Sequence, residues 1–268
     1  MSESEDSKFM NWTYDDFKKG VLELTAINLS SYKERQMKRR IDSLLSRSGY
    51  NEYKDYFDVL SVNSELLDKF VNYLTINVSE FYRNPEQWKI LEQQILPDLI
   101  KKHSKIRIWS AACSTGEEPY SLTILLSAFL PLDSIKILAT DIDVAAIDKA
   151  KAGVYNAKSL ETLPAIHKDG FFRNQNGLFT LDDKIKECVE FRQHDLLREP
   201  FPGKFHLVLC RNVMIYFTEE AKELLYRKFH DSLESDGVLF VGSTEQVIFP
   251  QRYNLKPMRT YFYKRIDA

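Results

Sequence analysis

The stretch Ile106–Leu122 constrains the fold of this 268-residue chain more than any other part of its sequence. It opens with a run rich in β-formers, Ile106–Trp109, and passes through small residues into a turn, Cys113–Gly116. Pro119 follows closely, and proline suits the first turn of a helix, where its missing N–H breaks no bond. The succession of strand, tight turn and helix predicts the opening of a nucleotide-type βαβ unit and hence an α/β fold.

This turn lacks the composition of a phosphate-binding loop. Gly116 is a single glycine where the dinucleotide fingerprint G-x-G-x-x-G requires more, and no Lys-Ser/Thr pair follows it as in a P-loop. Glu117 and Glu118 stand where a phosphate site would need bare backbone N–H groups and positive potential. We therefore expect a cationic or hydroxyl-rich ligand rather than a polyphosphate.

An aspartate follows the second predicted strand, Ile135–Ala139. Asp141 lies about 25 residues beyond the first turn, where an acidic residue commonly holds ribose hydroxyls. Aspartates also cap helices, and Asp143 is well placed as the N-cap of a helix that ends at Gly153. Asp141 is thus a candidate ligand-binding carboxylate, with helix capping as the alternative role for an aspartate here.

The α/β alternation continues to the end of the chain, with one irregular excursion. The further predicted strands are Val189–Arg192, Phe205–Leu209, Gly237–Gly242 and Thr260–Lys264, with an amphipathic helix beginning at Thr218. Two short pieces, Gly177–Leu181 and Lys184–Glu190, predict a small β-hairpin insertion at about 170–190.

The N-terminal part of the chain predicts only helices. Thr13 with Asp16, and Ser31 with Glu34, have the spacing of capping boxes ahead of apolar residues at helical intervals. We therefore expect a small all-α domain before the α/β domain.

The boundary between the two expected domains, 1–76 and 77–268, falls at a link with the sequence NVSEFYRN, residues 77–84. A plain connector is one interpretation of this link. Connectors seldom carry polar and aromatic residues so densely, however, and loops on rigid scaffolds are where sites lie. The link is therefore also a candidate part of the site.

The second predicted helix is strongly basic. It carries six positive charges against the two acids Glu34 and Asp42; the cations are Lys33, Arg35, Lys38, Arg39, Arg40 and Arg47. One interpretation is a solvated outer face. The other is a docking surface for an acidic partner, either a glutamate-rich helix or a phosphate backbone.

Composition excludes several classes of protein. A net charge of -2 gives no global attraction to nucleic acid or membrane. Cys113, Cys188 and Cys210 form no C-x-x-C pair and the histidines no H-x-x-x-H pair, so we expect neither a disulfide framework nor a metal site. The start, MSESEDSKF, has no signal-peptide profile, and no apolar run approaches the roughly 20 residues that span a bilayer. We therefore expect a cytoplasmic protein.

Four motifs occur in a definite order: NVSEFYRN at 77–84, WSAACSTGEEPYS at 109–121, ATDID at 139–143 and CRNVMIYF at 210–217. Together they resemble the CheR-type chemotaxis receptor methyltransferases over nearly the whole chain. The resemblance implies a Rossmann-like S-adenosylmethionine (SAM) methyltransferase domain with a small β-hairpin insertion, preceded by a small all-α domain. It also implies methyl transfer from SAM to glutamate side chains of chemotaxis receptors, which leaves S-adenosylhomocysteine.

The resemblance also implies roles for individual residues. The positions that match cofactor contacts are Asn77, Ser79, Arg83, Glu117, Asp141, Asp195, Leu196, Arg211 and Asn212. Family members can carry Asn in place of Asp195, which leaves open whether its side chain matters. Tyr216 matches a residue facing the acceptor, and Arg83 or Arg211 can fix the acceptor carboxylate, so Arg83 and Tyr216 are the candidate catalytic residues. The candidate receptor-docking residues are Lys33, Arg35, Arg39, Arg40 and Arg47.

Two rival functions fit parts of the sequence. A nucleic-acid methyltransferase would use the basic helix to hold phosphate, but the D/N-P-P-Y/F motif usual for methylation of base amino groups is replaced by Arg211–Met214. A SAM-binding signalling module without catalysis is the second rival, although no motif is damaged. We expect chemotaxis receptors as partners, with no nucleic acid, no membrane insertion and no metal, and a monomeric enzyme.

Overall fold

A computed structural model describes residues 12–267, which form two compact units. The helical unit comprises the chain through Ile76 together with a later segment, Tyr216–Ala221. The sheet unit comprises Asn77–Ile215 and the chain from Lys222 onward. The segment MSESEDSKF, interpreted above as lacking a signal peptide, lies outside the described residues. Within 12–267, no helix has both the length and the apolar character needed to cross a bilayer.

The helical unit is built around buried aromatic rings. Phe17, Tyr56 and Phe70 are fully buried, and the Phe17 ring lies 5.9 Å from the Phe70 ring and 6.4 Å from the Tyr56 ring. These rings come from three helices, so they hold the unit together through apolar burial. The elements of the unit are α1 (Tyr14–Thr25), η2 (Leu29–Ser31), α2 (Glu34–Arg47), α3 (Tyr53–Val62) and α4 (Ser64–Thr75).

One of the two predicted capping boxes forms. Thr13 caps α1, because its hydroxyl accepts from the Asp16 N–H at 3.2 Å and the Asp16 carboxylate accepts from the Thr13 N–H at 3.1 Å. The box predicted for Ser31 and Glu34 is wrong, since Lys33 is the N-cap of α2 and makes no side-chain cap bond.

The reason lies far along the chain, in the segment Tyr216–Ala221 that belongs to the helical unit. Lys33 N–H donates to the Tyr216 carbonyl at 2.8 Å, and Thr218 N–H donates to the Ser31 carbonyl at 2.9 Å. These bonds place Tyr32 opposite Phe217 in an antiparallel bridge. The backbone at Tyr32 is therefore extended, and the helix can begin only afterwards.

The sheet unit contains a seven-stranded sheet in the order β6-β2-β1-β7-β8-β10-β9. Every pair from β6 to β8 is parallel, whereas β10 is antiparallel to both of its neighbours. The strands are β1 (Ile108–Ala111), β2 (Ile137–Asp141), β6 (Val189–Gln193), β7 (Phe205–Cys210), β8 (Leu233–Val241), β9 (Leu255–Arg259) and β10 (Phe262–Arg265).

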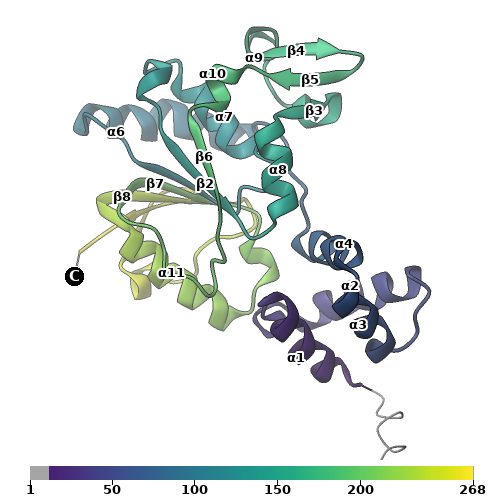
Figure 1. Ribbon diagram of the computed structural model, residues 1–268. Helices are drawn as coiled ribbons and strands as arrows, with labels where there is room; N and C mark the ends of the chain where they lie inside the picture. Colours follow the sequence, from purple (N-terminus) through teal and green to yellow (C-terminus); the bar gives the residue numbers. More distant parts are fainter. Residues whose placement is uncertain (1–11, 268) are drawn as a thin grey trace, which may run out of the picture. The chain divides into compact units, whose positions relative to one another are not determined.

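Helices cover both faces of this sheet (Figure 1). The chain moves one way along the sheet from β1 to β2 and the other way from β7 to β8, so right-handed crossovers place their helices on opposite faces. Thus α7 (Glu117–Leu126) and α8 (Val144–Ala152) lie on one face, and α11 (Glu219–Ser232) on the other. The remaining elements are α5 (Pro85–Ile90), η3 (Leu91–Ile95), α6 (Leu96–Lys102), η4 (Leu132–Ser134), η6 (Met214–Tyr216) and η7 (Pro250–Tyr253). The predicted α/β fold is confirmed.

The insertion contains a hairpin, but its strands differ from those predicted. β4 (Phe172–Gln175) and β5 (Leu178–Leu181) are joined by Asn176 and Gly177, both with positive φ, and β3 (Val154–Asn156) pairs with β5. Asn-Gly is the usual sequence of a two-residue hairpin turn, so the turn itself fixes the register. The prediction for Lys184–Glu190 is wrong, because that stretch continues α10 (Asp183–Lys186) and then enters β6. Between β3 and β4 the insertion holds η5 (Ala157–Leu160) and α9 (Ala165–Phe171).

Candidate functional site

The parallel strands of the sheet unit end at one common edge. β1 ends at Ala111, β2 at Asp141, β7 at Cys210 and β8 at Val241. In open α/β sheets, ligands bind outside the carboxyl ends of the strands, where the strand order reverses on either side of the first strand. The loops that leave these four strands therefore delimit the candidate site.

The turn after β1 is tightly wound. Ala112, Ser114 and Gly116 all have φ between 49° and 92°, in the left-handed region. A Cβ added at Gly116 would lie 2.8 Å from the Cβ of Ala150 on α8, so this one position needs glycine both for its backbone and for helix packing. The turn thus adopts left-handed backbone conformations at several positions, although it lacks the further glycines of a phosphate loop.

Asp141 fastens this turn to the end of β2. Its Oδ2 accepts from the Ser114 N–H at 2.7 Å, and its Oδ1 accepts from the Asp143 N–H at 3.0 Å. Burial raises the pKa of Asp141 to about 6, although these hydrogen bonds oppose the shift. Each carboxylate oxygen has a second lone pair, which suits the hydroxyl pair of a ribose.

Asn77 joins the link to the turn after β1 and to the turn after β2. Its Nδ2 donates to Asp143 Oδ2 at 2.6 Å, and its Oδ1 accepts from the Ser114 hydroxyl at 3.0 Å. Asp143 meanwhile caps α8 as predicted, because its Oδ1 accepts from the Ala146 N–H at 3.1 Å. The polar residues of the link are thus part of the strand-end cluster.

Glu117 occupies the first turn of α7 beside the same link. Its Oε2 accepts from the Thr115 hydroxyl at 2.6 Å, and its carboxylate also hydrogen-bonds to Ser79. Burial raises the pKa of Glu117, whereas these hydrogen bonds lower it. The structure therefore brings Asn77, Ser79, Glu117 and Asp141 into one cluster of the sheet unit.

The neighbouring Glu118 forms a buried ion pair with Arg211, whose side chain is 2% exposed. Arg211 Nη1 lies 3.2 Å from Glu118 Oε2, and the Ser110 hydroxyl donates to Glu118 Oε1 at 2.8 Å. Burial raises the pKa of Glu118, whereas the charge of Arg211 lowers it.

Arg211 also fixes the backbone of the link. Its Nη2 donates to the Arg83 carbonyl at 2.7 Å and to Gln87 Oε1 at 3.1 Å, and its guanidinium lies 4.6 Å from the Phe240 ring centroid. Both terminal nitrogens are therefore engaged inside the protein. This geometry suits a residue that positions Arg83 better than one that grips an acceptor carboxylate. The Arg83 side chain donates from Nη1 to the Val78 carbonyl at 3.0 Å.

A buried glutamate that the sequence did not indicate, Glu245, ties the loop after β7 to the loop after β8. Its carboxylate accepts from the backbone N–H groups of Asn212, Gly242 (2.9 Å) and Ile215 (3.1 Å). A Cβ added at Gly242 would lie 2.3 Å from Glu245 Oε2. No local sequence pattern indicates a role for Glu245, because its partners are backbone groups that only strand pairing brings together.

The loop after β6 reaches the same edge through His194, whose N–H donates to the Asp141 carbonyl at 2.9 Å. The next two residues are Asp195, whose Oδ1 accepts from the Leu197 N–H at 2.8 Å, and Leu196, which is buried. Asp195 thus shapes its own turn. Tyr216 is half-buried and belongs to the helical unit rather than to this cluster.

The basic helix α2 presents only part of its charge to solvent. Arg35, Arg39 and Arg47 are exposed and Lys33 is half-buried. Arg40 is engaged within the helical unit, because its guanidinium donates to the Tyr73 carbonyl and lies 4.6 Å from the Tyr73 ring centroid. The exposed arginines are therefore the better candidates for docking.

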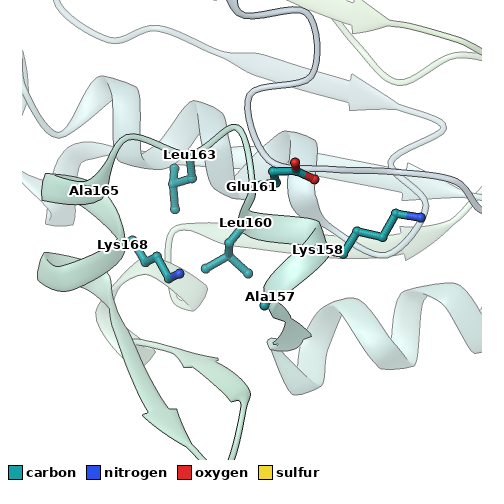
Figure 2. A pocket seen from close by; sticks show the side chains of 7 residues that line it. All are labelled: Ala157, Lys158, Leu160, Glu161, Leu163, Ala165 and Lys168. Carbon is teal, nitrogen blue, oxygen red and sulfur yellow. The ribbon is translucent and has the colours of Figure 1, made fainter.

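A separate hollow of about 450 Å³ lies in the insertion, between η5 and α9 (Figure 2). Leu160 and Leu163 line it, together with Lys168, while the ammonium group of Lys158 extends away. It contains none of the predicted site residues. Among residues 12–267, no group of three or more His, Cys, Asp or Glu side chains is arranged to hold a metal ion.

Known proteins with similar sequences identify the family. Residues 77–262 match the family described as CheR methyltransferase, SAM binding domain, and residues 13–75 match CheR methyltransferase, all-alpha domain. A "Chemotaxis protein methyltransferase" of Listeria innocua is 40% identical over 238 residues, covering 88% of this chain and 91% of that protein. A protein of the same name from Salmonella typhimurium is 32% identical over 235 residues, covering 84% and 80%. The resemblance carried by the four motifs is confirmed.

Solved structures add a partial likeness. The SAM-dependent methyltransferase SibL matches 60% of this chain and 37% of its own, with 17% identity and a TM-score of 0.36. A match of this extent supports no argument about function. The sequence relatives and the residues at the strand ends carry that argument instead.

The buried ion pair yields a stability prediction. Arg211→Met removes the cation and leaves Glu118 buried without its charged partner, so we expect the sheet unit to lose about 3–5 kcal/mol of unfolding free energy at pH 7.5. Loss of the cation further raises the folded-state pKa of Glu118 above its unfolded value. Protonation therefore relieves the defect, and the loss should shrink as the pH falls toward 5.5.

Urea unfolding at both pH values measures this effect. The double variant Arg211→Met with Glu118→Gln is the matched control, since it removes both charges and should recover part of the lost stability. Equal stability of wild type and Arg211→Met at pH 7.5 would contradict the assignment of a buried ion pair.

Proposed function

The chain belongs to the CheR methyltransferase family, and from that premise we propose that it transfers the methyl group of SAM to glutamate side chains of chemotaxis receptors. The family match covers a SAM-binding methyltransferase domain. The link to chemotaxis is supported by the names of relatives that share most of their length with this chain. The glutamate acceptor is our proposal and rests on the resemblance to the family.

The acidic cluster at the strand ends is the observation that carries this proposal. SAM offers a ribose with two hydroxyls, an amino acid head and a sulfonium cation. Asp141 supplies a carboxylate for the hydroxyls, and Glu117 supplies one for the positively charged groups. The donor set of the link and first turn, including Asn77, Ser79 and Ser114, is polar and adjacent to both acids. These residues fit SAM and would repel a polyphosphate.

The reaction needs little from the protein beyond positioning. A glutamate side chain has a reference pKa of about 4.3, so near pH 7 it is already an ionised nucleophile. SAM, when bound, supplies a methyl carbon bonded to sulfur, and the S–C bond breaks as the carboxylate oxygen forms its bond to that carbon. No general base is required, because the carboxylate carries no proton to remove.

Orientation of the acceptor carboxylate is therefore the main task. We assign this to Arg83, whose guanidinium can hold a carboxylate through paired hydrogen bonds, and to Tyr216, whose hydroxyl can orient it. Arg211 supports the first of these by gripping the Arg83 carbonyl. Glu245 supports the second through the N–H of Ile215, the residue before Tyr216.

A direct transfer assay tests the proposed function. We expect labelled methyl from SAM to appear on a receptor cytoplasmic fragment as an alkali-labile ester, and to disappear when the accepting glutamates are changed to alanine. SAM binding without transfer to any receptor fragment would favour a non-catalytic signalling module. Transfer to DNA or RNA would favour the rival nucleic-acid methyltransferase.

The raised pKa of Asp141 predicts how SAM affinity depends on pH. Because the pKa is about 6 in the free protein, the carboxylate becomes protonated as the pH falls from 7 to 5. A protonated carboxyl accepts ribose hydroxyls less well, so we expect affinity to fall by about tenfold over this range. Asp141→Asn should bind weakly and show a flatter profile, while Asp133→Asn at an exposed position should behave as wild type. Calorimetric titration at several pH values measures this, and a flat wild-type profile would exclude the role.

The proposed orienting roles of Arg83 and Tyr216 predict a loss of turnover that persists at saturating SAM. At saturating SAM, we expect Tyr216→Phe and Arg83→Ala to lower kcat by about tenfold to hundredfold, since a misplaced acceptor oxygen lowers the rate steeply. Arg83→Lys keeps the charge without the planar fork and should recover little. If a variant methylates the receptor fragment as fast as wild type, the residue changed in that variant does not orient the acceptor.

The exposed arginines of α2 predict an electrostatic contribution to docking. Receptor methylation regions are rich in glutamate, so the double variant Arg35→Glu and Arg39→Glu should raise KM for the receptor fragment by about tenfold at low salt. The double variant Lys19→Glu and Lys69→Glu makes the same charge change elsewhere in the helical unit and is the matched control. The effect should shrink with added salt. Methylation kinetics insensitive to both reversal and salt would rule out this docking surface.

A further inference from the structure

We infer that the loop Gly242–Phe249 presents an apolar contact, Ile248 and Phe249, to an acidic helical segment of the protein substrate. This inference rests on the proposed function and adds a second recognition surface, in the sheet unit. Ile248 is 67% exposed and Phe249 is 61% exposed, and they are adjacent in sequence. Two large apolar side chains so exposed side by side are unusual on a surface that contacts only water.

The loop leaves the sheet at the edge that carries the reaction site. β8 runs parallel to β7 and ends at Val241, so the loop begins beside the end of β7. Glu245 makes this proximity direct, because its carboxylate accepts from Gly242 N–H in this loop and from Asn212 N–H in the loop after β7. A partner that presents a side chain at the strand ends can therefore reach this loop.

The loop is anchored at two residues just before the apolar pair. Glu245 is buried by its backbone partners, and the next anchor, Val247, is 5% exposed and donates its N–H to the Tyr263 hydroxyl at 3.0 Å. The outward position of Ile248 and Phe249 thus follows from fixed neighbours.

The backbone at Phe249 supports a specific role for its ring. Its φ of 51° lies in the left-handed region, which bulky residues rarely adopt and where Asn or Gly would be comfortable. The guanidinium of Arg252 lies 4.9 Å from the ring centroid and holds the ring from one side. A strained, exposed and stacked phenylalanine is the arrangement expected of a contact residue.

Charge decides which partner fits. The loop's acid, Glu245, is buried, whereas two cations toward this end of the sheet are exposed: Arg252, whose guanidinium lies on the Phe249 ring, and Arg259, which pairs with Phe262 beside the carboxyl end of β8. An apolar pair flanked by these cations complements a helix that carries glutamates beside an apolar stripe. That is the chemistry of a glutamate-bearing substrate helix, and a neutral apolar partner would gain nothing from these charges.

The test uses the full chain with the double variant Ile248→Ser and Phe249→Asn, because Asn accepts the left-handed backbone without strain. We expect KM for a receptor cytoplasmic fragment to rise by about tenfold, as the apolar burial on docking is lost. kcat at saturating fragment and the Kd for SAM should stay within about twofold of wild type. Ile166→Ser is the matched control, since Ile166 is 78% exposed on α9 in the same unit.

Each other outcome overturns the inference in a distinguishable way. An unchanged KM shows that the pair makes no contact with substrate, while the proposed function stands. A weakened Kd for SAM places the pair in the cofactor site instead. If the wild type is a dimer and the double variant is a monomer with unchanged KM, the apolar pair is a self-association surface. If the wild type binds anionic vesicles and the double variant does not, again with unchanged KM, the pair is a membrane contact. Absence of methylation by the wild type overturns the proposed function together with this inference.

Discussion

The site depends on the buried positive charge of Arg211. Arg211 is buried at the end of β7, and its charge is balanced by Glu118 at the start of α7. An unpaired cation there would be strongly destabilising, so the strand end, the helix start and the link must assemble together. Through its second terminal nitrogen the same guanidinium holds the Arg83 carbonyl. One buried pair thereby fixes the backbone of a residue proposed to orient the acceptor.

A second set of acids serves a different purpose at the same edge. Asp141 and Glu117 are buried and accept hydrogen bonds from neutral donors, and burial raises the pKa of both. Their hydrogen bonds come from backbone N–H groups and hydroxyls of the first turn, the loop after β2 and the link, and these bonds leave acceptor capacity unused. The contrast with Glu118 separates an acid that stabilises the fold from acids suited to a positively charged, hydroxyl-bearing ligand.

The two proposed recognition surfaces have different physical characters. The exposed arginines of α2 act over a distance and should respond to salt, whereas Ile248 and Phe249 act only on contact. The first belongs to the helical unit and the second to the sheet unit. For an acidic helical substrate, as proposed, the charges would speed the encounter between the two proteins, and the apolar pair would fix the position at which they dock.

The sequence by itself determined the α/β class, the helical N-terminal part and the residues of the first turn and link. These depend on local patterns, such as the strand, turn and helix of Ile106–Leu122, that need no distant partner. Tertiary structure alone decided the use of Arg211, the start of α2 and the importance of Glu245. Arg211 is paired because Glu118 and the Arg83 carbonyl surround it, and α2 begins late because Tyr216–Ala221 bonds to the chain before it. Such partners lie tens of residues or more away along the chain, and strand pairing or packing within one unit brings them together only in the folded chain.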